Sequence, residues 1–337
     1  MKKAVIASAV LSALVSGSAL AANVYSADGT ELNIGGRAEF RGDFGADTDG
    51  EKIEGTMQNN SRFRLNVSGT TAINDSLSGF GKYEAEQRLE SSSDDSRNDA
   101  LRQRYLFAGL KGEFGAFSVG RQDTAGVQIS GMSDIGTHTG DQKAFIDAGN
   151  EQINNTFLYG FSTDSLNVQA SYIAGEDKDT DGFGISGIYS LPMGLDLGLG
   201  YAAGDNGVGN GSSDQIIAGV SYELDALYLG ATYTMGDIEL SDTSSAKQEF
   251  TGVELSAQYK LTNQFRLIAA YAKQEVENKS ASSKDVKSDF FELTGRYDFN
   301  KSIHTYASYK LNNLDNKDTN YDADAKDTIR LGLRYNF

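Results

Sequence analysis

Residues 250–261 read Phe-Thr-Gly-Val-Glu-Leu-Ser-Ala-Gln-Tyr-Lys-Leu and give the clearest indication of the fold. Alternate side chains of a β-strand point to opposite faces of the sheet, so a period of two is typical of a strand whose faces meet different surroundings. One face of this segment carries apolar or aromatic residues, namely Val253, Leu255, Ala257, Tyr259 and Leu261. The residues between them, on the other face, are small, polar or charged. The same alternation runs through 214–224 and 290–299.

Along the whole chain, this alternation predicts sixteen strands. A soluble sandwich also alternates, but its strands usually have about 5–6 residues, whereas many of these are about twice as long. We expect strands at 31–44, 57–71, 77–90, 101–111, 115–122, 153–162, 166–176, 183–191, 195–206, 214–224, 227–241, 249–262, 265–278, 287–300, 303–315 and 326–337.

The gaps between these strands alternate between short turns and longer polar connections. Outer-membrane barrels are built in this way, with tight periplasmic turns and longer external loops. We therefore predict an all-β fold, a 16-stranded antiparallel transmembrane β-barrel. About sixteen strands enclose an aqueous channel, whereas eight leave room only for side chains. The third external loop, about 123–152, is the longest connection, and a loop of that length is usually functional.

The N-terminus predicts export. Lys2 and Lys3 precede an apolar run at 4–15, and Ala19-Leu20-Ala21 has the small-residue pattern of a cleavage site. An uncleaved membrane anchor is the alternative, but spanning a bilayer takes about 20 apolar residues. No later segment is long and apolar enough for a transmembrane helix. We expect residues 1–21 to be a signal peptide, cleaved after Ala21, and residues 22–337 to form one barrel domain of the outer membrane.

Composition narrows the function further. The formal charge is −17, and without Lys2 and Lys3 the chain keeps 28 basic against 47 acidic side chains, about −19. Nucleic acid is excluded as a partner because it requires a basic surface. Cysteine is absent, and the single proline, Pro192, suits a chain that is mostly hydrogen-bonded ladder. We expect no cofactor and no metal site.

The C-terminus ends in a strand with one apolar face. Residues 328–337 alternate, and Tyr335 and Phe337 close the apolar side. The alternative is the last strand of an ordinary soluble sheet. A terminal phenylalanine that closes an alternating strand resembles the assembly signal of outer-membrane barrels. The barrel-assembly machinery is therefore an expected partner.

Several segments resemble the general Gram-negative porins, most closely those of vibrios. They are 35–39 (GGRAE), 60–66 (NSRFRLN), 73–77 (INDSL), 81–86 (GKYEAE), 104–111 (RYLFAGLK) and 115–121 (GAFSVGR). The resemblance covers the whole chain after the signal peptide. It implies a homotrimer in outer-membrane lipid and lipopolysaccharide, with the third external loop folded inward to narrow each pore. Acidic residues of that loop then face basic residues of the wall.

The resemblance also assigns residues to this constriction. The basic wall positions correspond to Arg37, Arg64 and Arg104, with Arg62 and Arg102 beside them. An alternative for Arg62, Arg64 and Arg102 is a structural network with Glu84 and Glu86. The loop positions correspond to Asp134, His138 and Asp141. His138 stands where the family has a glutamate, Asp141 is a shifted acidic residue, and Gln152 stands where a wall arginine is expected.

A second resemblance concerns contacts between subunits. The family latches its second external loop onto the neighbouring subunit, and here that loop carries Asp94, Asp95 and Asp99, with Arg121 as a candidate basic partner. From the acidic composition we predict a diffusion porin for ions and small hydrophilic solutes with mild cation selectivity, because rings of acidic groups favour cations.

Outer-membrane barrels also serve three other kinds of function. Enzymes of the outer membrane need a nucleophile with a base, or a carboxylate with a histidine, and the chain has only His138 and His304. We therefore expect no enzyme. A sugar-specific channel would line its path with aromatic residues, for which Phe290 and Tyr306 are inward-facing candidates. An adhesin or receptor would use the acidic loops.

Overall fold

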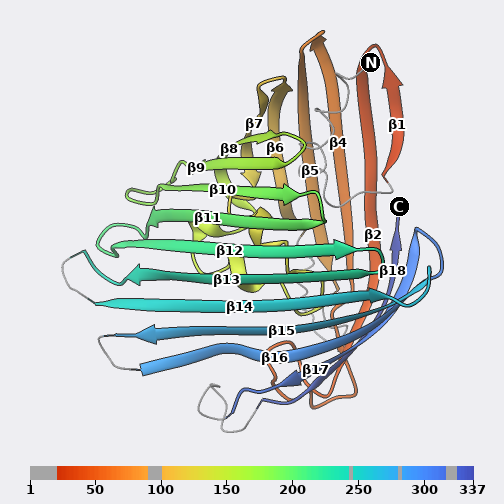
Figure 1. Cartoon of the computed structure of the whole chain (residues 1–337), viewed down its shortest axis with the longest axis vertical. Helices are drawn as coiled ribbons and strands as arrows, with labels where there is room; N and C mark the ends of the chain where they lie inside the picture. Colours follow the sequence, from red (N-terminus) through yellow and green to blue (C-terminus); the bar gives the residue numbers. More distant parts are fainter. Residues whose placement is uncertain (1–20, 90–100, 243–245, 280–282, 316–324) are drawn as a thin grey trace.

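The structure, a computed structural model of the 337-residue chain, describes residues 21–89, 101–242, 246–279, 283–315 and 325–337. Sixteen antiparallel strands close into a barrel, which confirms the predicted fold (Figure 1). They are β2 (Thr30–Phe44), β4 (Arg62–Asn74), β5 (Leu77–Arg88), β6 (Arg102–Gly112), β7 (Gly115–Gln122), β8 (Ile153–Ser162), β9 (Leu166–Ile173), β10 (Gly182–Leu191), β11 (Leu195–Asp205), β12 (Ser212–Leu224), β13 (Leu227–Glu239), β14 (Lys247–Lys260), β15 (Phe265–Asn278), β16 (Ser283–Asp298), β17 (Ile303–Asn312) and β18 (Thr328–Asn336).

The barrel closes between the last strand and the first long one. In the antiparallel pairing of β18 with β2, Leu333 lies opposite Phe40 and Tyr335 opposite Ala38. The ladder then runs to the chain end, where the N–H of Gly36 donates to the carbonyl oxygen of Phe337 at 2.8 Å. Every long strand thus has a hydrogen-bonded neighbour on both sides, which a sheet needs to be stable in lipid.

Two short strands pair with β2. β3 (Gln58–Asn59) pairs with its end and falls within the strand predicted at 57–71, which the structure divides before β4. β1 (Ala22–Ala27), which forms a hairpin with the beginning of β2, was not predicted. All six residues of β1 are exposed, so β1 has no buried face to impose an alternating pattern, and backbone pairing alone leaves no hydrophobic signal in the sequence.

The two faces of the wall are inverted relative to those of a soluble protein. In β14, Glu254 and Ser256 are only 1% and 5% exposed, whereas Leu255 and Tyr259 are 46% and 51% exposed. The polar side chains therefore point inward and the apolar ones outward. The outward apolar run at 253–261 covers about 20–25 Å of membrane thickness on a strand tilted by about 40°, close to the apolar band of such barrels.

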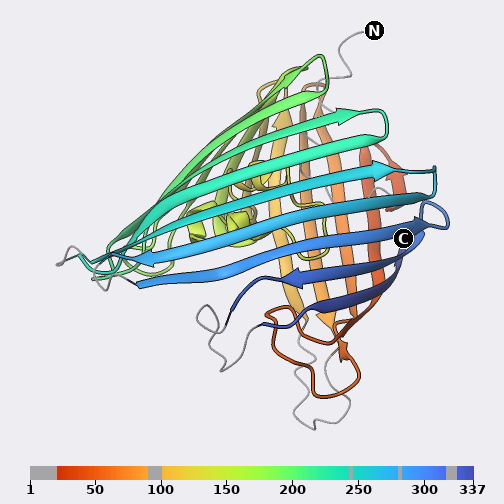
Figure 2. The same ribbon diagram turned by 60° about the horizontal axis from the view of Figure 1, so that its bottom comes forward.

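The short connections lie at one end of the barrel (Figure 2). Their polar side chains close the turns locally: Asn74 accepts from the N–H of Ser76 at 3.0 Å, and Asn300 accepts from the N–H of Ser302 at 2.8 Å. A side chain that binds the backbone two residues onward favours a tight reversal. This agrees with the predicted alternation of short and long connections.

Loop 123–152 contains the helical turns of the structure's described residues. They are α2 (Val127–Ser130), η1 (Asp141–Lys143) and η2 (Asp147–Gly149). In Figure 2 these turns are enclosed by the strands, and the loop packs on the buried side of the wall: the rings of Phe145 and Phe250 stack at 4.4 Å. No helix of the described residues is long and apolar enough to cross a membrane.

Candidate pore constriction

Two carboxylates of the wall hold the tip of loop 123–152, which consists of residues 137–140. Glu292 in β16 accepts hydrogen bonds from the backbone N–H groups of Thr137 and His138 at 2.8 and 3.0 Å. Glu254 in β14 accepts one from the N–H of Gly140 at 2.8 Å. Hydrogen bonds to carboxylates are about twice as strong as those between neutral groups. The wall therefore fixes the backbone of the tip directly.

Glycines of the wall make room for the middle of the loop. The hydroxyl of Tyr228 donates to the carbonyl oxygen of Met132 at 2.7 Å. A Cβ atom at Gly230 would stand 2.0 Å from that oxygen, and one at Gly219 would stand 2.9 Å from the side chain of Ile129. Real atoms do not approach so closely, so the loop lies against the wall only because these positions lack side chains.

The root of the loop is tied to the neighbouring strand. Asp123 accepts hydrogen bonds from the hydroxyl of Tyr105 at 3.0 Å and from the N–H of Gln152 at 3.1 Å. Burial and the nearby Glu151 carboxylate raise the pKa of Asp123. Both ends of the loop thus meet at one carboxyl group. Gln152 contributes its backbone here, in a left-handed conformation with a φ of 57°.

Carboxylates of the loop surround one lysine. The ammonium of Lys143 lies 3.7 Å from Asp134 and 3.6 Å from Glu151. Both acidic side chains are 34% exposed, whereas Lys143 is 11% exposed. The surrounding protein partly desolvates the carboxylates of Asp134 and Asp141 and so raises the pKa of both, although Lys143 opposes this. The pKa of Lys143 is raised because Glu151, Asp134 and Asp141 outweigh the opposing effect of its burial.

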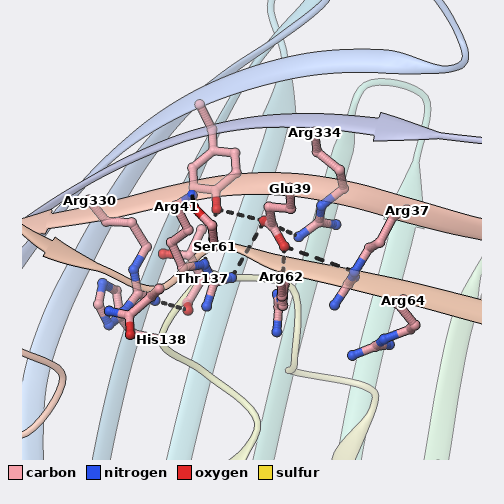
Figure 3. A network of polar contacts seen from close by, with 12 residues as sticks. Arg37, Glu39, Arg41, Ser61, Arg62, Arg64, Thr137, His138, Arg330 and Arg334 are labelled. Carbon is pink, nitrogen blue, oxygen red and sulfur yellow. Dashed lines mark hydrogen bonds and ion pairs between the residues drawn. The ribbon is translucent and has the colours of Figure 1, made fainter. Parts of the chain in front are cut away.

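Arginines converge on the buried Glu39 of β2 (Figure 3). Two of the contacts are close ion pairs at 2.6 Å, made by Arg62 from β4 and Arg334 from β18. Arg41 and Arg37 lie farther from the carboxylate, at 3.7 and 3.9 Å. The group joins the first and last strands of the barrel, so closure of the barrel creates it.

A second set of ion pairs lies on the adjoining strands. Arg64 approaches Glu86 at 2.5 Å and Glu84 at 3.4 Å, and Arg104 donates to Glu84 at 2.8 Å. Lys82 lies 3.8 Å from Glu84 and 4.5 Å from the centre of the Tyr105 ring. These contacts fix the orientation of the basic side chains before any solute arrives.

The cluster on the wall and the cluster on the loop carry net charges of opposite sign. Seven arginines share three glutamates, so this part of the wall carries a surplus of positive charge: Arg37, Arg41, Arg62, Arg64, Arg88, Arg104 and Arg334 around Glu39, Glu84 and Glu86. On the loop, Asp134 and Glu151 share the single Lys143. Separated surpluses of opposite sign produce a field across the space between them.

Most of the predicted basic residues lie together. Arg37, Arg62, Arg64 and Arg104 belong to the ion-pair network, as the structural alternative for Arg62 and Arg64 also required. Arg102 is exposed at the beginning of β6 and makes no ion pair with Glu84 or Glu86 among the described residues. That alternative is therefore wrong for Arg102.

The predicted loop residues separate into two groups. Asp134 and Asp141 are exposed, whereas His138 is only 7% exposed and lies at the tip against the wall.

Arg121, the candidate for a contact between subunits, donates to the carbonyl oxygen of Gln103 and to the side chain of Asn154 in its own chain. The predicted partners of Arg121, namely Asp94, Asp95 and Asp99, lie outside the described residues, as does the predicted signal peptide through residue 20.

The charged residues of the site that sequence reasoning missed include Glu39, Arg330, Arg334 and Lys143. Glu39 and Arg334 meet only through the pairing of β2 with β18, and Arg330 binds Asp43 of β2 at 2.7 Å in the same way. Lys143 stands beside Asp141 in the sequence, but its contacts reach Asp134 and Glu151. The inward positions of the alternating pattern were the available signal for the three wall residues.

The alternative of a sugar-specific channel finds no support in the positions of its two aromatic candidates. Phe290 and Tyr306 are 3% and 6% exposed, so their rings do not offer a surface on which a sugar could stack. Within the described ranges, no three or more His, Asp or Glu side chains are grouped to hold a metal ion.

An apolar outer surface, sixteen closed strands and a charged interior define a channel of the outer membrane. The family model described as Gram-negative porin matches residues 7–337, and the chain belongs to this family. It is a channel rather than an enzyme, and it acts as an outer-membrane porin for general diffusion.

The chain is similar to known outer-membrane proteins in sequence and to solved structures in fold. Outer membrane protein U of Vibrio parahaemolyticus is 34% identical over 286 residues, covering 77% of each chain. Porin-like protein L of Photobacterium profundum is 32% identical, covering 77% of this chain and 78% of its own. The fold is similar to OmpF of Salmonella typhi in complex with daunomycin, with a TM-score of 0.79 at 20% identity over 94% of this chain and all of that chain. It is also similar to OmpT of Vibrio cholerae in its trimer form, with a TM-score of 0.72 at 19% identity over 92% and 100%.

Proposed function

We propose that the pore passes ions and small hydrophilic solutes with a mild preference for cations, and that loop 123–152 and the wall arginines form its constriction. The observation that carries the proposal is the opposed charge surplus of loop and wall. The field between them orients polar solutes. The strongly acidic chain sets the overall preference, because acidic groups near a narrow passage raise the local concentration of cations.

Reversal potentials of the purified protein in planar bilayers, under a KCl gradient, test this. We expect a reversal potential of the cation-selective sign. Asp134→Asn is expected to weaken the preference, and Arg64→Gln to strengthen it, because each removes one charge of the constriction. Asp164→Asn, at a short turn, is the matched control and leaves the potential unchanged. A clear anion preference of the unmodified protein would overturn the proposal, and saturable block by a sugar would favour a substrate-specific channel.

We further propose a homotrimer, processed after Ala21 and assembled through the Tyr335 and Phe337 end by the barrel-assembly machinery. The trimer form of the related OmpT supports the oligomer. A groove of about 570 Å³ reaches the apolar residues Phe40, Phe63 and Leu333 and offers a surface for neighbouring chains or for the lipid and lipopolysaccharide. Conductance that falls in three equal steps during closure supports the trimer, and single steps only would refute it. N-terminal sequencing tests the cleavage.

A further inference from the structure

We propose that Lys143 is a specificity-determining residue that limits the cation preference of the pore, acting as a fixed counter-cation beneath the carboxylates of loop 123–152. The inference rests on the proposed constriction. It adds a basic residue to the side of the pore that the sequence predicted to be acidic, and it concerns the degree of selectivity rather than its sign.

The position of Lys143 is fixed from several directions. Its ammonium donates a hydrogen bond to the carbonyl oxygen of Gly140 at 2.7 Å. The preceding residue, Gln142, is buried, and its carbonyl oxygen accepts from Gln215 and Thr234 of the wall at 3.3 and 3.2 Å. The short helical turn η1 is thereby held against β12 and β13. The lysine therefore has a defined place in the loop.

The ammonium group of Lys143 lies close to the lumen but does not project into it. The ammonium is 3.6–3.7 Å from Asp134 and Glu151, whose side chains are three times as exposed as its own. A passing ion thus meets the carboxylates first and experiences the ammonium directly behind them. At such distances the ammonium offsets much of the negative potential that the two carboxylates would produce alone.

The magnitude follows from Coulomb's law. One unit charge about 10 Å from the ion path changes the local concentration of each ion by about twofold in a water-like dielectric. Because cations and anions respond in opposite directions, loss of the ammonium is expected to raise the cation-to-anion permeability ratio by roughly two- to fourfold. Salt screens this effect, with a Debye length of about 10 Å at 0.1 M, so it is largest in dilute KCl.

The test compares charge variants of the full-length protein in planar bilayers under a dilute KCl gradient. We expect Lys143→Gln to raise the permeability ratio roughly two- to fourfold. Lys143→Arg keeps the charge and is expected to match the unmodified protein. Lys301→Gln removes one positive charge at an exposed turn far along the chain, and it should leave the ratio unchanged.

A double variant separates electrostatics from loosening of the loop. Asp134→Asn combined with Lys143→Gln restores the net charge of the loop, so we expect its ratio to return toward that of the unmodified protein. A ratio that Lys143→Gln leaves unchanged, or that the double variant fails to restore, overturns the role of Lys143. An anion-selective unmodified protein in which Lys143→Gln still shifts the ratio toward cations refutes only the proposed cation preference.

Discussion

Acidification is expected to release the tip of loop 123–152 from the wall, because His138 is held there in its neutral form. Among the described residues, neither ring nitrogen of His138 has a hydrogen-bond partner, and the rings of His138 and Phe290 pack edge to face at 6.3 Å between centroids. Burial lowers the pKa of His138 well below 6.5, and the neighbouring cations lower it further. The charged groups around it come from four strands: Arg330, Lys310, Arg41 and, as acceptor of its backbone N–H, Glu292.

The sign and size of the effect follow from linkage. A histidine whose pKa is depressed in the folded state stabilises that state above the unfolded pKa, here 6.5, and the stability is lost as the pH falls below it. Each pH unit of this range removes about 1.4 kcal/mol. Each pH unit between the unfolded pKa and the depressed pKa of the folded state therefore raises the ratio of released to seated tips by up to about tenfold.

Single-channel recording between about pH 7.5 and pH 5 measures this release as more frequent transitions between conductance levels. The transitions should disappear in His138→Phe, which keeps an aromatic ring without a titratable nitrogen. His304→Gln removes the only other histidine and should retain them. Persistence of the acid-induced transitions in His138→Phe, or a steady conductance of the unmodified protein at pH 5, would refute the reasoning.

Three further outcomes are expected. Gly230→Ala places a Cβ 2.0 Å from the carbonyl oxygen of Met132, so it should displace the loop and increase single-channel conductance, whereas Gly187→Ala, whose Cβ would have no neighbour closer than 3.8 Å, should not; equal conductances would contradict this. Glu292→Gln weakens two hydrogen bonds of the tip and should cost the seated tip about 1–3 kcal/mol, which faster proteolysis of the loop would reveal. Deletion of Phe337 should reduce the heat-modifiable trimer in outer-membrane fractions, and undiminished trimer would exclude an assembly role.

The wall was predictable because its pattern is local. Each strand places alternate residues in water and in lipid, and two solvents of such different polarity impose a period of two that is visible at 250–261. The even number of strands and the alternation of turn lengths follow from the same pattern. β1 escaped this reasoning because none of its residues is buried, so only hydrogen bonding to β2 defines it.

The constriction was only partly predictable. Arg37, Arg62, Arg64 and Arg104 were found from the resemblance, and their inward direction follows from the alternation. Their partner Glu39 lies two residues from Arg37, yet its role was not evident, since it depends on Arg334, almost 300 positions away. Such contacts arise from closure of the barrel.

Short stretches of sequence are therefore enough to indicate the compartment, the membrane-facing pattern and the family of this porin, because the export pattern at the N-terminus, the alternation and the motifs each extend over a few neighbouring residues. The charge balance of the proposed constriction depends instead on the three-dimensional arrangement of the chain. Lys143 and Asp134 are nine positions apart on an irregular loop, and no period relates them. Their 3.7 Å approach depends on where Glu254, Glu292 and the glycines of the wall hold that loop.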